Sequence, residues 1–320
     1  MPTRTLRPMS EYDVIILGGG AAGLSAALVL SRAQRRIAVV DAGRPRNLPA
    51  AHMHGFLSRD GLPPTELLRL GRAEVDSYGG ELIAATAIEA QQVDGGFEVR
   101  LDNDELLTGR RLLVATGLRD ELPDIPGLRA RFGRDVLHCP YCHGHEVRDL
   151  RLGVIGGAPN SLHQANLVRQ WASDVVFFSH GTPLTADQRE QLVARAIGIV
   201  DGEVTRIVAA DDILRGVEID EKFVARDAVF VAPTFVPHHE LLSSLGCGLD
   251  DNGWTAVDPA GRTSVPGVWA AGNAVNPRAQ VITAAGDGSA AAISLNADLL
   301  EEDIRDAVAL FRLGQPSDSS

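Results

Sequence analysis

The sequence predicts an α/β fold made of two units of parallel strands and helices, with the second unit inserted into the first. Three observations predict it. A strand, a glycine turn, a helix and a second strand follow one another near the N-terminus, the same pattern recurs after residue 150, and the strand and helix that complete the first unit come only near the C-terminus. With 320 residues and a hydrophobic content of 45%, the chain can bury two cores.

The first unit opens with "DVIILGGGAAGLSAALVLSRAQRRIAVVDAG", a buried apolar strand, a glycine turn, a helix of small residues and a second strand. Gly18 permits the tight turn, Gly20 lets a pyrophosphate approach the backbone, and Gly23 lets the helix lie close to the strand. The helix N-terminus supplies amide donors. Asp41, at the end of the second strand, can accept hydrogen bonds from ribose hydroxyls. This pattern favours a dinucleotide-binding unit of Rossmann type over a glycine turn in an ordinary α/β unit.

Two later segments extend this unit. The strand "RLLVATGL" ends in the small residues Ala115, Thr116 and Gly117, which suit a backbone that passes close to a cofactor, although any strand-to-turn junction can have this composition. Near the C-terminus, "GVWAAGNAVNPRAQVITAAGDGSAAAISL" predicts a strand, a Gly-Asn turn and a long alanine-rich helix. The first amides of that helix can point at a ligand, or the helix can simply be closely packed on a sheet.

The second unit repeats the strand, turn, helix and strand in "LRLGVIGGAPNSLHQANLVRQWASDVVFFSH", but its fingerprint is degenerate. The three glycine positions are Gly156, Ala158 and Ser161, and Pro159 lies in the turn, so a phosphate fits less easily. The segment after the second strand offers no acid for a ribose and no arginine for a 2'-phosphate. Binding of NADPH is therefore doubtful.

The stretch "HCPYCHGHE", His138 to Glu146, allows four interpretations: a redox disulfide, a zinc site, covalent haem attachment, or coincidence. Haem attachment follows export, and the N-terminus lacks the apolar region of a signal peptide. Zinc is disfavoured because the adjacent Cys142 and His143 bind one ion awkwardly and no second C-x-x-C completes a site, so we expect no metal. The third cysteine, Cys247, is predicted to be a small buried residue.

Charge and hydropathy restrict the partners. The net charge of -12 argues against nucleic acid and against an anionic membrane, because both require a basic surface. No apolar run reaches the roughly 18 residues of a membrane span, so we expect a cytoplasmic protein. The stretch "HMHGF", His52 to Phe56, fits a loop that lines a cofactor cleft and an ordinary surface loop equally well.

The order of these motifs resembles the low-molecular-weight thioredoxin reductase family of flavoproteins. The resemblance runs from about residue 12 to 305 and includes the glycine fingerprint, the A-T-G strand, the C-x-x-C before a second Rossmann-like unit, and A-A-G-N followed by T-A-A-G. It implies FAD, a redox-active disulfide that faces the flavin, and a homodimer. It also implies an FAD-binding domain in two parts, residues 1–118 and 238–320, around an inserted pyridine-nucleotide-type domain, residues 119–237. The end of the chain, "LGQPSDSS", is predicted to be a disordered tail.

The same resemblance assigns site residues. Cys139 would exchange with the substrate and Cys142 would face the flavin. The residues assigned to the ADP half, the ribityl chain and the ring of FAD are Gly18, Gly20, Ala22, Gly23, Asp41, Thr116, Gly117, Gly272, Asn273, Gln280 and Val281.

Three departures from the reductases change the functional prediction. The usual acid after the second cysteine is replaced by His143, which titrates near neutrality and can favour a thiolate or accept a thiol proton. His145 is a second candidate for that role. Asn273 stands where the reductases usually carry Asp, and the nicotinamide turn is degenerate. These departures resemble the dithiol oxidase branch of the family.

Three functions are consistent with the sequence. The first is an FAD-dependent dithiol oxidase that closes a disulfide in a small-molecule dithiol, with O2 as acceptor and H2O2 as product. The second is a reductase of a thioredoxin-like protein, fed by NADPH or by another donor such as ferredoxin. The third is a non-catalytic flavin redox sensor.

Overall fold

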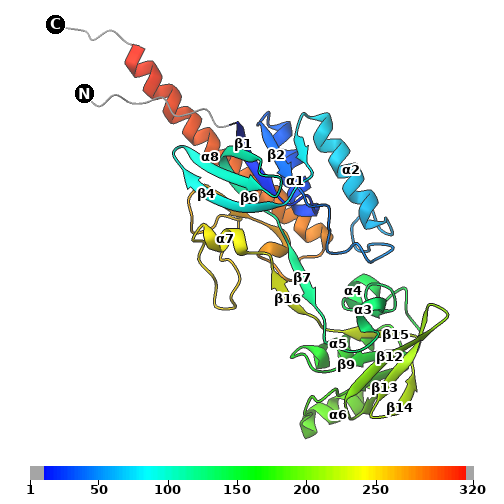
Figure 1. The fold of residues 1–320 in the computed structure, drawn as a ribbon. Helices are drawn as coiled ribbons and strands as arrows, with labels where there is room; N and C mark the ends of the chain where they lie inside the picture. Colours follow the sequence, from blue (N-terminus) through cyan, green and yellow to red (C-terminus); the bar gives the residue numbers. More distant parts are fainter. Residues whose placement is uncertain (1–10, 315–320) are drawn as a thin grey trace. The chain divides into compact units, whose positions relative to one another are not determined.

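The chain folds into two compact units in a computed structural model, which is described here for residues 11–314 (Figure 1). Unit 1 comprises Met1–Pro45, Thr65–Leu118 and Pro237–Ser320. Unit 2 comprises Arg46–Pro64 and Arg119–Val236. Each unit is built around its own parallel sheet, with helices on one face and an antiparallel layer on the other.

The sheet of unit 1 has the order β3-β2-β1-β6-β5-β4, with β17 paired to β6. Its parallel part is β3 (Glu81–Ile83), β2 (Ile37–Val40), β1 (Tyr12–Leu17), β6 (Leu106–Val114) and β17 (Val268–Ala270). The first half of β6 pairs antiparallel with β5 (Gly96–Leu101), which pairs with β4 (Ala87–Val93). Strand β6 therefore joins the parallel sheet to an antiparallel layer.

The two faces of this sheet carry separate cores because side chains alternate along each strand. Val14 and Ile16 of β1 lie in one core with α1 (Ala21–Arg32) and α8 (Val281–Gly314). Ile15 and Leu17 lie in the other core with β4, β5 and the short α7 (Glu240–Ser244). Helices α1 and α8 are in close contact, since a Cβ added at Gly288 of α8 would lie 2.0 Å from the carbonyl oxygen of Ala22. Helix α2 (Pro64–Ser77) completes unit 1.

Unit 2 repeats this architecture on a five-stranded sheet with the order β11-β10-β9-β15-β8. The strands are β11 (Ile197–Val200), β10 (Val175–Phe178), β9 (Leu152–Ile155), β15 (Ala228–Val231) and β8 (Val136–Leu137). Helices α5 (Ser161–Val168) and α6 (Ala186–Ala194) share a core with one face. The antiparallel strands β12 (Val204–Ala210), β13 (Ile213–Ile219) and β14 (Lys222–Ala225) form a small sheet, and the first two share a core with the other face.

The chain passes between the units at four places. Two of them form a two-stranded ribbon of β7 (Leu118–Glu121) and β16 (Thr234–Pro237). The other two bracket Arg46–Pro64, a segment that leaves unit 1, contributes to unit 2 and returns. The α/β fold with one Rossmann-like unit inserted into another is confirmed.

The end of the chain differs from the prediction. Leu313 and Gly314, expected to start a disordered tail, are the last residues of α8, and residues 315–320 lie outside the described part of the chain. Within residues 11–314, no helix is long and apolar enough to cross a membrane.

Candidate active site

The glycine turn between β1 and α1 forms an open cradle at the N-terminus of α1. Gly18 has φ +108°, and a Cβ added there would lie 2.4 Å from the carbonyl oxygen of Ala115, so the turn fits only glycine. A Cβ at Gly23 would lie 1.8 Å from the carbonyl oxygen of Gly18, which explains the close approach of helix and strand. A Cβ at Gly20, in contrast, would meet no protein atom within 4 Å. The open space at Gly20 lies beside the first amides of α1, which have no acceptor within the helix.

Asp41 follows β2, and an ion pair with a residue of α2 holds its side chain in place. Nη2 of Arg72, from α2, lies 2.5 Å from Oδ2 of Asp41, and both side chains are partly exposed. The ion pair occupies Oδ2, so Oδ1 remains as an acceptor of the kind that a ribose hydroxyl requires. The sequence predicted Asp41 but not Arg72, because the contact joins α2 to β2 and has no fixed spacing along the chain.

Thr116 and Gly117 lie where β6 ends, and both are tied to the chain that returns from unit 2. The Thr116 hydroxyl donates a 2.7 Å hydrogen bond to the carbonyl oxygen of His238, and the amide of His238 donates to the carbonyl oxygen of Gly117 at 3.0 Å. These bonds give the two residues a structural role at the crossing. Their contact with a cofactor stays a prediction.

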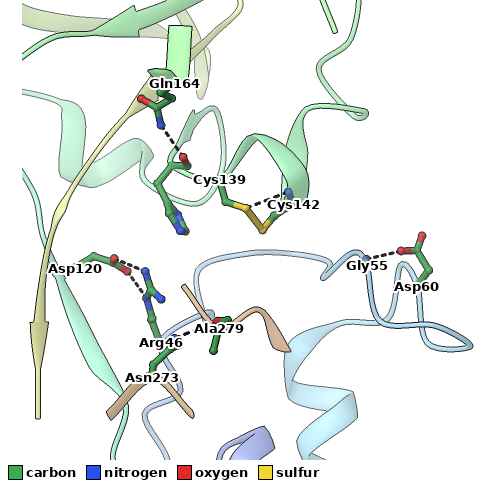
Figure 2. The surroundings of a disulfide bond; sticks show 10 residues. Arg46, Gly55, Asp60, Asp120, Cys139, Cys142, Gln164, Asn273 and Ala279 are labelled. Carbon is green, nitrogen blue, oxygen red and sulfur yellow. Dashed lines mark hydrogen bonds and ion pairs between the residues drawn. A yellow bond between two sulfur atoms is a disulfide. The ribbon is translucent and has the colours of Figure 1, made fainter. Parts of the chain in front are cut away.

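Asn273 organises the loop that leads into α8. Its Nδ2 donates hydrogen bonds to the carbonyl oxygens of Asn276 (2.9 Å) and Ala279 (3.1 Å, Figure 2). An aspartate carboxylate at this position has no hydrogen to donate to either carbonyl. The Asn273 amide is therefore matched to the two carbonyl oxygens of this loop.

The remaining residues predicted to bind FAD lie around the same ends of α1 and α8. Ala22 is buried, and a Cβ added at Gly272 would lie 2.8 Å from its methyl group. Gln280 precedes α8 and its carbonyl oxygen accepts the amide of Ala284 at 2.8 Å, while Val281 is the first residue of the helix. Unit 1 thus brings together the two helix N-termini, the glycine turn and Asp41, and this arrangement fits FAD.

The disulfide lies at the start of the short helix α4 (Pro140–His143) in unit 2 (Figure 2). Cys139 is the N-cap residue and Pro140 takes the first helical position, where its missing N–H costs nothing. The amide of Cys142 donates to Sγ of Cys139 at 3.2 Å. The same donor can stabilise a Cys139 thiolate after the disulfide opens.

His143 ends α4 and is half-buried, whereas His145 is exposed in the turn that follows. Burial lowers the pKa of His143 below its usual value, an effect that the nearby Glu146 opposes and His54 reinforces. The imidazole is therefore neutral near pH 7 and suited to accept a proton. Both histidines follow Cys142 closely in the sequence. The structure distinguishes them because His143 is half-buried and His145 is exposed.

His138, beside Cys139, is enclosed by aromatic rings. Its ring centroid lies 6.0 Å from that of Phe132 and 6.2 Å from that of Phe235. Burial lowers the pKa of His138 to about 4, with a smaller contribution from Arg46. Nε2 of Gln164 donates to the His138 carbonyl oxygen at 2.6 Å, which fixes the backbone just before the disulfide. His138 is therefore a neutral packing residue.

A basic-acidic pair lies at the base of the β7/β16 ribbon. Arg46 binds Asp120 of β7 through two hydrogen bonds of 2.8 and 2.6 Å (Figure 2). Its guanidinium carbon also lies 4.8 Å from the ring centroid of Phe235 in β16. Arg46 thus contacts both strands of the ribbon, a role for which the sequence contains no motif.

The second glycine turn, between β9 and α5, is closed by its own neighbours. The amide of Gly157 donates a 2.7 Å hydrogen bond to the hydroxyl of Thr182. The His180 ring lies against the same turn, since a Cβ added at Gly157 would be 3.2 Å from its Cδ2. One backbone amide of this turn is therefore already bonded to a side chain.

Residues 11–314 contain no group of three or more His, Cys, Asp or Glu side chains placed to hold a metal ion. The cysteines predicted as alternative zinc ligands form a disulfide instead.

An FAD-type cradle in one unit and a C-x-x-C disulfide in the other define a flavin-dependent oxidoreductase that acts on sulfur groups. Residues 12–288 match the family model described as pyridine nucleotide-disulphide oxidoreductase. The chain belongs to this family, and its cofactor is FAD.

Solved structures and a curated relative are similar over most of the chain. A crystal structure of HlmI is 54% identical, with a TM-score of 0.91, and the match covers 93% of this chain and 96% of HlmI. A putative thioredoxin reductase TrxB from Bacillus anthracis is 32% identical, with a TM-score of 0.88, over 91% of this chain and 99% of that one. Thioredoxin reductase tcpT from Claviceps purpurea is 30% identical over 290 residues, which is 82% of this chain and 86% of tcpT. These similarities show a thioredoxin reductase-like enzyme.

Proposed function

We propose that this protein is an FAD-dependent dithiol oxidase that forms a disulfide in a small-molecule dithiol and passes the electrons to O2, with H2O2 as product. The hydrogen bond from Gly157 to Thr182 carries this proposal. This bond supports the view that unit 2 does not bind a pyridine nucleotide. The residues expected to bind FAD and the redox disulfide are, in contrast, all present.

The chemical steps use the two sulfurs in turn. A substrate thiolate attacks Sγ of Cys139, the Cys139–Cys142 bond breaks, and Cys142 leaves as a thiolate. The second substrate thiol loses its proton and attacks the substrate sulfur of the mixed disulfide. The substrate departs as a disulfide and Cys139 is released as a thiolate, which the Cys142 amide stabilises.

His143 handles the proton in this sequence. Its neutral imidazole accepts the proton of the second substrate thiol, and its burial keeps it in that form near pH 7. FAD, which Gly18, Gly20 and Asp41 would hold, would supply the two-electron acceptor for the reduced cysteine pair and the connection to O2. The proton taken by His143 and one from solvent complete H2O2.

The alternative is a reductase of a thioredoxin-like protein, which receives electrons from NADPH or ferredoxin. It is favoured by the names of the relatives, thioredoxin reductase TrxB and tcpT. A small dithiol and a thioredoxin-like protein are the two kinds of substrate that the family implies.

Anaerobic stopped-flow mixing separates these functions. We expect a dithiol such as dithiothreitol to bleach the flavin absorbance near 450 nm and the reduced enzyme to release H2O2 when air is admitted. NADPH should leave the flavin oxidised on the same timescale. Rapid bleaching by NADPH would instead assign the reductase function, and no turnover with any dithiol would assign a sensor.

Three further assignments are proposed with this function. The FAD-binding domain corresponds to unit 1 and the inserted pyridine-nucleotide-type domain to unit 2, with its main boundaries near residues 118 and 237 and the segment Arg46–Pro64 in addition. The protein acts in the cytoplasm. It acts as a homodimer, which light scattering after size exclusion tests; exposed apolar side chains along α8 support a subunit contact, among them Ile293, Leu300, Ile304 and Phe311.

A further inference from the structure

The segment Arg46–Pro64 brings charged groups to the active-site turn, although it lies far from that turn in sequence. Its fold is fixed by Asp60, whose Oδ1 accepts the amide of Gly55 at 2.8 Å (Figure 2). The other carboxylate oxygen of Asp60 lies 3.2 Å from Nδ1 of His54. The Gly55 amide and the His54 ring hold the pKa of Asp60 below its usual value. The loop therefore presents His54 in one orientation.

The second nitrogen of His54 faces the turn that follows the disulfide. Its Nε2 lies 3.5 Å from Oε1 of Glu146, and the His54 side chain is 20% exposed. An imidazole has one N–H and can donate to one carboxylate, whereas an imidazolium donates to both. A carboxylate oxygen thus lies near each ring nitrogen of His54.

Glu146 comes three residues after His143, and helical dihedral angles at Gly144 continue the turn between them. This spacing puts the two side chains on the same side of the turn. The carboxylate of Glu146 raises the pKa of His143, and the ring of His54 lowers it. The other titratable groups of this cluster are Asp60 from the loop and His138 and His145 from the segment around α4.

We propose that His54 is a positioning residue for the dithiol reaction: it holds the Glu146 carboxylate beside His143 and balances its charge. Without His54, the negative charge next to His143 is uncompensated and the imidazole retains its proton to higher pH. Without Glu146, the positive charge of His54 acts alone and the imidazole loses its proton at lower pH. This proposal rests on the proposed function, in which His143 accepts the thiol proton.

The test compares His54→Gln and Glu146→Gln with the unmodified holoenzyme. The rate of anaerobic flavin reduction by dithiothreitol is measured from pH 5 to 9. We expect the acidic limb to move up by about 0.5 pH unit in His54→Gln and down by about 0.5 pH unit in Glu146→Gln, a range set by partly screened charges. The double variant should lie close to the unmodified enzyme. Shifts in the same direction, or an unchanged limb in His54→Gln, would overturn the proposal.

A second measurement needs no turnover. The 13Cε1 resonance of His143, assigned with a His143→Gln variant, is titrated in protein labelled at histidine. Its midpoint should move with the kinetic limb in each variant. His54→Lys keeps the charge and should restore the midpoint, whereas His52→Gln, at an exposed position of the same loop, should not move it.

Where His54→Gln loses flavin or helical circular dichroism, His54→Asn replaces it and should also move the midpoint upwards. A downward or absent shift there contradicts the proposal. Flavin reduction by NADPH in the unmodified enzyme would refute the oxidase function, and it does not enter this comparison. The two failures are therefore distinguishable.

Discussion

The backbone amide of Gly157 donates a 2.7 Å hydrogen bond to the hydroxyl of Thr182. The equivalent turn of unit 1 is open at Gly20, where a Cβ would meet no atom within 4 Å. Gly157 corresponds to Gly19 of unit 1, where a Cβ would lie 2.7 Å from Cγ of Asp41, and Gly20 corresponds to Ala158 of unit 2. The two turns thus differ at the position of close approach, which is an open glycine in unit 1 and an alanine in unit 2. The difference supports one dinucleotide site, in unit 1, and a second unit that serves to carry the disulfide.

The open space at Gly20 gives the first prediction. Gly20→Ala should lower FAD affinity at least about tenfold, since the methyl group would occupy the space of the pyrophosphate and not of the protein. The apoprotein should unfold at nearly the same urea concentration, because alanine at this cap costs only about 1 kcal/mol. Flavin fluorescence titration measures the affinity. Unchanged flavin binding would show that the pyrophosphate lies elsewhere.

The disulfide gives the second prediction. Cys139→Ser and Cys142→Ser should each lower dithiol oxidation by at least about 10³-fold, because residues that act as one unit fail together. Both variants should remain yellow. Cys247→Ala, at a buried thiol outside the disulfide, is the control and should retain turnover. Peroxide release and the absorbance at 450 nm are the two measurements, and substantial turnover in either serine variant would exclude the sulfur route.

The burial of His143 sets the third prediction. Because its pKa is lowered, the active neutral form persists below pH 6.5, and the acidic limb of the reaction should have its midpoint below that value. His143→Ala should slow oxidation by about 10²-fold and remove this limb from the pH profile. A profile that is unchanged in His143→Ala and altered in His145→Ala would assign the proton to His145.

The loop that precedes α8 gives the fourth prediction. Asn273→Asp replaces a donor to two carbonyl oxygens with a carboxylate, and it should destabilise unit 1 by about 1–3 kcal/mol at pH 8. Protonation restores one donor, so the loss should be smaller near pH 4. Chemical unfolding at the two pH values measures it. Asn252→Asp, in an exposed turn, is the control, and an equal loss there would remove the explanation.

The buried imidazole of His138 gives the fifth prediction. Its pKa is about 4 in the folded protein and about 6.5 in an unfolded chain, so below pH 6.5 the unfolded chain binds a proton that the folded one does not. Stability should therefore fall as the pH falls from about 6.5 towards 4, with a total loss of about 3 kcal/mol. His138→Phe should reduce this slope in unfolding experiments. The exposed His163→Gln should leave the slope unchanged, and identical slopes in all three proteins would contradict the assignment.

The sequence was informative where chemistry depends on local spacing. The strand, glycine turn, helix and acid of unit 1 follow one another within residues 12–41, and the fold confirms their order. The pairing of Cys139 with Cys142 is equally local. The degenerate second turn was visible as Ala158 and Pro159, but its closure by Thr182 depends on how β10 ends in space.

The contacts that join distant segments could not be predicted. Arg72 at Asp41, Arg46 at Asp120 and His54 at Glu146 have no characteristic spacing. The stretch "HMHGF" fitted two interpretations equally because a histidine in a loop takes its role from whichever segment lies opposite. In the sequence, this segment could be recognised only by its two histidines, His52 and His54, which lie near Gly55 and Asp60.

The path of Arg46–Pro64 limits how this protein can be taken apart. A gene fragment that encodes only residues 119–236 would supply Asp120 without the guanidinium of Arg46 and Gly133 without Pro49, which lies close enough that a Cβ on the glycine would be 2.7 Å from it. Grafting the disulfide module onto a related flavoprotein would therefore require transplanting two pieces of sequence. In a natural recombination event, the short piece would have to travel with the long one.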